Sequence, residues 1–136
     1  MAGKIFCLEG EWETSYNSKL SVKSSLDLLS SVANIPYVFR TVSTHDEFYY
    51  HLKKSVRYES LDIVYLAFHG TKGTIWLPDG TAPTLKDLEV KNPNSFKDKF
   101  VLISACNVLK NEEAAESFKE QTKAKLVIGY HKYIDF

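Results

Sequence analysis

Two apolar runs, at residues 61–68 and 100–105, constrain the fold of this chain more than any other part of its sequence. They read LDIVYLAF and FVLISA, and aliphatic or aromatic side chains occupy all but one position of each. Such runs are typical of strands in a parallel sheet, because helices cover both faces of that kind of sheet. A chain of 136 residues with two such strands has the size of one α/β domain.

Weaker signals around these runs predict further strands and helices. The spacing of a capping box between Thr44 and Glu47 predicts that a helix begins there. Asn111, followed by two glutamates, has the pattern of another helix start. A short helix is expected over residues 84–90. An earlier helix is predicted by apolar residues at helical spacing, which are Val22, Leu26, Leu29 and Ala33. Strands are also predicted at residues 4–8, 37–42 and 126–128.

This order of elements predicts a three-layer α/β/α domain with a mainly parallel sheet, spanning residues 1–136. Right-handed crossovers would place the second strand outside the first, followed on the other side by the third, fourth and fifth. Residues 73–77 alternate in polarity and Pro78-Asp79-Gly80 follows them, so a hairpin is expected between the third and fourth strands.

Charge balance and the lack of sorting signals exclude several classes of function. Basic and acidic residues number 17 each and are interspersed, so no basic footprint for nucleic acid is predicted. No apolar run approaches the roughly 18 residues that cross a membrane. The residues after Met1 do not resemble a signal peptide, so we expect a cytoplasmic protein.

The two cysteines, Cys7 and Cys106, are not expected to form a disulfide in that reducing compartment. Cys7 lies within the first predicted strand and is expected in the core. No pair or cluster of cysteines and histidines has the spacing of a metal site, so neither a metal nor another cofactor is predicted.

His69 and Cys106 carry the clearest chemical signal. Each follows one of the two apolar runs, and the carboxyl ends of parallel strands are where reactive groups collect. Adjacent strands lie about 4.8 Å apart, so the two side chains can converge on one bond. An imidazole beside a thiol supplies the thiolate that nucleophilic catalysis requires. The backbone N–H groups of Gly70 and Cys106 would form the oxyanion hole.

Taken singly, a cysteine or a histidine at the end of a strand is more often a packing residue than a catalytic one. The two motifs together, YLAFHG at residues 65–70 and VLISAC at residues 101–106, resemble those of the caspase-like cysteine peptidases. The Ser-Ala-Cys-Asn context is closest to the bacterial CHAT branch of that group, whose members often act in defence or cell-death pathways. The resemblance implies a Cys–His dyad, a peptide or protein substrate, and no required acidic third member.

Caspase-like domains usually continue past the fifth strand, through a segment that forms part of the substrate pocket. This chain ends at Phe136, soon after the fifth predicted strand. We therefore expect a truncated, processed or naturally short form that lacks a C-terminal strand. A missing edge strand would leave a sheet edge open to self-association.

Three further residues are candidates for substrate contact. Glu9 and Glu11 follow the first predicted strand, where carboxylates could select a basic side chain, although a solvated loop after the strand is the favoured interpretation. Asn107 follows the cysteine and either contacts substrate or begins a turn. Trp76, in the predicted hairpin, is expected to anchor it rather than to form a substrate wall.

Two other classes of function stay open. The same fold without catalysis would serve as a regulatory or interaction domain. A flavodoxin-like binder of small ligands is disfavoured, because LEGEW follows the first strand where a glycine-rich or hydroxyl-rich phosphate loop would be needed.

Overall fold

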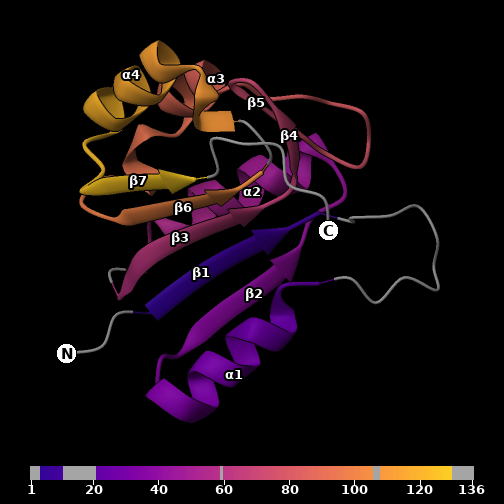
Figure 1. The fold of residues 1–136 in the computed structure, drawn as a ribbon, viewed down its shortest axis with the longest axis vertical. Helices are drawn as coiled ribbons and strands as arrows, with labels where there is room; N and C mark the ends of the chain where they lie inside the picture. The colour runs from indigo at the N-terminus through magenta and orange to yellow at the C-terminus, as the bar shows by residue number, and fades with distance from the viewer. Residues whose placement is uncertain (1–3, 11–20, 59, 106–107, 130–136) are drawn as a thin grey trace.

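Five parallel strands form the central sheet of the computed structural model, which describes residues 4–10, 21–58, 60–105 and 108–129 (Figure 1). The strands lie in the order β2-β1-β3-β6-β7, which confirms the predicted order. Their bounds are Lys4–Glu9 for β1, Tyr37–Thr41 for β2, Leu61–Ala67 for β3, Phe100–Ser104 for β6 and Leu126–Gly129 for β7.

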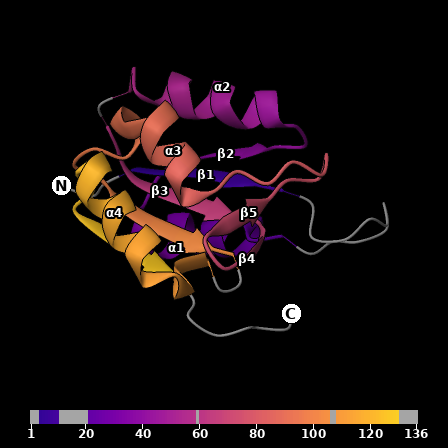
Figure 2. The same cartoon turned by 90° about the horizontal axis from the view of Figure 1, so that it is seen from above.

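Helices cover both faces of this sheet, so the predicted three-layer α/β/α class is correct (Figure 2). On one face, α1 (Lys23–Ala33) packs Leu26 against Ile5 and Cys7 of β1. The other face carries α2 (His45–Ser55), α3 (Leu85–Lys91) and α4 (Glu112–Thr122). Their buried side chains join those of β1, β3 and β6 in the main core, for example Phe48, Leu88 and Phe118.

The face that carries α1 is only partly covered by the described residues. Ile63, Phe100 and Leu126 pair in register across β3, β6 and β7, and so do Tyr65, Leu102 and Ile128. We call these six residues the apolar sheet face. Three of them are about half exposed: Phe100 at 46%, Leu126 at 42% and Ile128 at 50%.

Local capping explains where the helices begin. The Thr44 hydroxyl accepts a hydrogen bond from the Glu47 N–H, and the Glu47 carboxylate accepts one from the Thr44 N–H. This is the predicted capping box. Asn111 caps α4 by accepting from the Ala114 N–H, also as predicted. The expected helix over residues 84–90 is present as α3.

Two expectations were wrong in detail. Of the predicted apolar stripe, Leu29 is 42% exposed, Ala33 is also exposed, and Val22 is the N-cap that precedes α1. Leu26 is therefore the buried residue of that helix. The predicted hairpin turns earlier than expected, between β4 (His69–Thr71) and β5 (Thr74–Trp76). Gly73 has φ of 73° and supplies the left-handed conformation of this turn.

In the described part of the chain, no helix is both long and apolar enough to cross a membrane. The expectation of a missing strand after β7 concerns residues 130–136, which lie outside the described residues.

Candidate functional site

The carboxyl ends of β1, β3 and β6 lie side by side at one edge of the sheet. The Gly10 N–H donates to the Ala67 carbonyl at 3.0 Å, which joins the end of β1 to that of β3. The Phe68 N–H donates to the Ser104 carbonyl at 3.3 Å, which joins the end of β3 to that of β6. This edge is where the sequence predicted the site.

His69 does not end β3, as the sequence suggested, but begins β4. The third strand stops at Ala67, and Phe68 is buried edge-to-face on Phe48 with ring centroids 5.5 Å apart. The chain then leaves the sheet, and the side chain of His69 is exposed in the β4–β5 hairpin. The hairpin therefore positions the imidazole, whereas the buried strand positions only the start of the hairpin.

Gly70 lies against the residues that flank positions 106 and 107. A Cβ atom built on Gly70 would lie 2.8 Å from Cβ of Ala105 and 2.6 Å from Cγ2 of Val108. The Gly73 N–H also donates to the Val108 carbonyl at 2.9 Å. The hairpin thus contacts the chain one residue before and two residues after the predicted nucleophile. Cys106 and Asn107 themselves lie outside the described residues.

The backbone of Gly70 is oriented away from its partner strand. Gly70 pairs with Ile75, but the Ile75 N–H donates to the Pro83 carbonyl at 2.9 Å instead of to Gly70. In an antiparallel ladder this identifies a non-hydrogen-bonded pair, in which the N–H groups of both residues point outward. The Gly70 N–H therefore points away from β5.

Trp76 is the cross-strand partner of His69 and is 43% exposed. Its indole N–H donates to the Thr71 hydroxyl at 3.0 Å, so the ring is fixed to its own hairpin. The sequence favoured a Trp76 that anchors the hairpin against the body of the domain, whereas this hydrogen bond lies within the hairpin itself. The pairing of β4 with β5 brings this indole beside His69, a relationship that no local sequence pattern indicates.

Glu9 is placed differently from either sequence interpretation. It lies within β1, is 4% exposed, and its carboxylate accepts hydrogen bonds from the Ser21 hydroxyl at 2.6 Å and the Val22 N–H at 2.7 Å. These bonds hold the start of α1 against the end of β1. The prediction for Glu11 concerns a residue outside the described part of the chain.

Cys7 is fully buried in the sheet, as expected. Burial, and secondarily the nearby Glu9 carboxylate, raises the pKa of the Cys7 thiol well above its usual range. A thiol that stays protonated at neutral pH is a poor nucleophile, so Cys7 is a structural residue.

The described residues contain no group of three or more histidine, cysteine, aspartate or glutamate side chains that could hold a metal ion. Within the described residues, the candidate site comprises the His69 side chain, the Gly70 backbone and the neighbouring Ala105 and Val108.

This arrangement defines an α/β domain with a histidine-bearing hairpin at the carboxyl edge of its parallel sheet. The chain belongs to the DUF6642 family, a family of unknown function, whose model matches residues 2–136. A search of curated proteins found no match.

Proposed function

We propose that this protein is a caspase-like cysteine endopeptidase with Cys106 as nucleophile and His69 as its acid–base partner. The observation that carries the proposal is the contact of Gly70 with both Ala105 and Val108. This contact supports a spatial relationship between the His69–Gly70 dipeptide and the segment that contains Cys106. The YLAFHG and VLISAC motifs supply the chemical identity.

In the proposed reaction, the Cys106 thiolate attacks the scissile carbonyl carbon after its proton has passed to His69. The imidazolium then protonates the leaving amine, and the carbon–nitrogen bond breaks to give an acyl-enzyme. Water hydrolyses that thioester and releases the thiol. The outward direction of the Gly70 N–H supports its role as one oxyanion donor, with the Cys106 N–H as the second.

The substrate in this proposal is a peptide or protein, and the compartment is the reducing cytoplasm, where an unpaired thiol persists. By its resemblance to the bacterial CHAT branch, we propose a role in a regulatory or defence pathway. Selection of a basic substrate side chain by Glu11, and substrate contact by Asn107, stay predictions from the sequence.

The test is labelling of the purified full chain with a panel of peptide acyloxymethyl ketones, read by intact mass. Wild-type protein should gain one label at Cys106. Cys106→Ala should gain none, and His69→Ala should react at least about tenfold more slowly, since general-base catalysis contributes roughly 10²–10⁴-fold. His45→Gln removes an imidazole elsewhere and should label like wild type. A wild-type protein that no probe labels, and that cleaves nothing in a diverse peptide library, would sink the proposal.

The apolar sheet face favours a second candidate function, that of a non-catalytic interaction domain. Contiguous exposed apolar side chains on a sheet are typical of surfaces that bind other proteins. In the described sheet β7 is also an edge strand, with one neighbour only, so it offers unpaired backbone groups. Self-association through this edge and face is the form of interaction that we propose for this alternative.

A further inference from the structure

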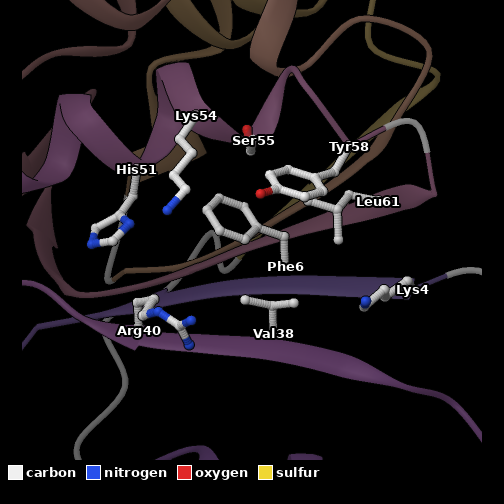
Figure 3. A pocket seen from close by; sticks show the side chains of 9 residues that line it. All are labelled: Lys4, Phe6, Val38, Arg40, His51, Lys54, Ser55, Tyr58 and Leu61. Atoms are coloured by element: carbon white, nitrogen blue, oxygen red, sulfur yellow. The ribbon is translucent and has the colours of Figure 1, made fainter.

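A cavity of about 230 Å³ lies between α2 and the first three strands of the chain, on the face opposite α1. Figure 3 shows Phe6 and Val38 on the sheet side of the cavity and His51 and Lys54 on the α2 side, with the Arg40 side chain on β2 at the end below His51. The cavity is separate in sequence and in lining residues from the candidate dyad.

Basic side chains from three different elements surround this cavity. They are Lys4 of β1, Arg40 of β2, and His51 and Lys54 of α2, and no aspartate or glutamate is among the nine lining residues. The whole chain has equal numbers of acidic and basic residues, so this is a local excess of positive charge. Low-dielectric walls focus such a field and attract anions.

Among the described residues, no ion pair joins Lys4, Arg40 or Lys54 to a carboxylate. The ion pairs found there join Lys23 to Asp27 and His45 to Asp46. One guanidinium nitrogen of Arg40 donates to the Phe39 carbonyl at 2.8 Å. A guanidinium has five N–H donors, so this bond does not use them all. The Lys54 ammonium lies 5.7 Å from the centroid of the Tyr50 ring, a contact that leaves its charge in place.

The positive charge around the cavity also affects the pKa of His51. Partial burial, followed by the charges of Arg40 and Lys54, lowers the pKa of His51, while Glu47 one turn earlier acts in the opposite direction. The two cations are therefore close enough to the imidazole to disfavour a further positive charge. A bound anion would reverse that effect.

The rest of the cavity is apolar and aromatic. Phe6 is 4% exposed and Leu61 3% exposed, and together with Val38 they form its floor. Tyr58 closes one end with a ring that is half exposed. The volume lies below the roughly 300–1,000 Å³ of sites for drug-sized ligands, which limits the occupant to a small molecule.

We propose that this cavity is a binding site for a small phosphate monoester whose organic group is apolar or aromatic. Arg40 and Lys54 would hold the phosphate, Lys4 would add charge from the sheet, and the Phe6 and Tyr58 rings would contact the organic group. A dianion suits a site lined by more than one cation better than a carboxylate does, because each cation in reach contributes a charge-assisted hydrogen bond. The proposal does not rest on peptidase activity.

The test uses phenyl phosphate, inorganic phosphate and phenol as probes of the full chain, in a buffer without phosphate or sulfate. Isothermal titration calorimetry should give saturable binding of phenyl phosphate at least about tenfold tighter than inorganic phosphate, and no measurable binding of phenol. Arg40→Gln and Lys54→Gln should each weaken phenyl phosphate binding by about tenfold or more, as expected for loss of a hydrogen bond to a charged group. Lys53→Gln, which removes the same charge one residue earlier on α2, should change the affinity less than twofold.

A second readout follows the His51 ring signal by proton NMR during a pH titration. Phenyl phosphate should raise the pKa of His51, and the His69 signal of the same spectrum serves as the internal control. Absence of saturable phenyl phosphate binding would overturn the proposal. So would equal weakening by Lys53→Gln and Lys54→Gln, because binding would then follow surface charge in general. The calorimetric titration is repeated with Cys106→Ala, whose affinity for phenyl phosphate should equal that of wild type. This comparison tests the cavity independently of the proposed peptidase activity.

Discussion

A side-chain carbon at Gly70 would lie 2.8 Å from Cβ of Ala105, closer than such atoms approach in folded proteins. The backbone of the β4–β5 hairpin at Gly70 therefore packs directly on the side chains of Ala105 and Val108, with no room for a methyl group between them. This contact links the two sequence motifs through their glycine and alanine. Its consequences can be tested without knowing a substrate.

Gly70→Ala should destabilise the fold by about 1–3 kcal/mol, the usual cost of overpacking, and should also abolish labelling of Cys106. The cause is the contact of the new methyl group with Ala105 and Val108. Gly80→Ala is the matched control: φ of 88° strains the backbone there, but no atom lies within 4 Å of the new methyl group. Urea unfolding and peptide-ketone labelling measure the two effects. Unchanged labelling in a folded Gly70→Ala variant would separate this contact from the proposed site.

The two cysteines should differ sharply in reactivity. Cys7 is fully buried, and burial raises the pKa of its thiol, so it should resist alkylation while the protein is folded. Iodoacetamide at neutral pH should therefore modify only Cys106 in native wild-type protein, as judged by peptide mapping. The Cys106→Ala variant should take up label only after unfolding. Rapid labelling of that variant in its folded state would contradict the structural role of Cys7.

Glu9 should matter for stability. Its buried carboxylate accepts hydrogen bonds from Ser21 and Val22, so Glu9→Gln should lower the free energy of unfolding by about 1–3 kcal/mol. The exposed Glu112 at the start of α4 is the control, and Glu112→Gln should cost no more than about 1 kcal/mol. Chemical denaturation measures both. If Glu9→Gln altered the preference for basic peptides and left stability unchanged, the sequence interpretation of this residue would be the correct one.

Lys99 should make the stability depend on alkaline pH. Its side chain is 9% exposed, and burial lowers its pKa, while Asp62 partly offsets the effect. The folded state therefore disfavours the charged form, and this penalty is relieved as pH rises from the lowered pKa toward the ordinary value of 10.5. Lys99→Met should remove that gain and raise the urea midpoint at pH 7. Urea midpoints of both proteins at pH 7 and pH 10 provide the comparison, and parallel pH dependence in the two would refute it.

The apolar sheet face should promote association. Phe100→Thr and Ile128→Thr should reduce concentration-dependent self-association in sedimentation velocity. Each should change the stability by no more than about 1 kcal/mol, because both side chains are half exposed. Val90→Thr removes an exposed apolar group from α3, on the opposite face, and should leave association unchanged. A wild-type protein that stays monomeric at millimolar concentration would argue against the self-association proposed for the second candidate function.

Much of the fold was predictable because its signals are local. The capping box of Thr44 and Glu47 and the cap at Asn111 depend on residues within one helical turn of each other. The strand order followed from apolar runs together with the fixed handedness of crossovers. The same local reasoning failed for Leu29, because whether a helix face is covered depends on how much sheet lies beneath it.

The sequence by itself determined the strands, their order and the edge at which His69 lies. Only the tertiary structure decided that this histidine begins a separate hairpin, that Gly70 touches Ala105, and that Glu9 turns inward to hold α1. It alone assembled the basic cavity, whose basic side chains lie at positions 4, 40, 51 and 54 of the chain. The reason is physical: propensity and capping act between near neighbours, whereas contacts between distant segments arise only when burial of the apolar runs brings them together.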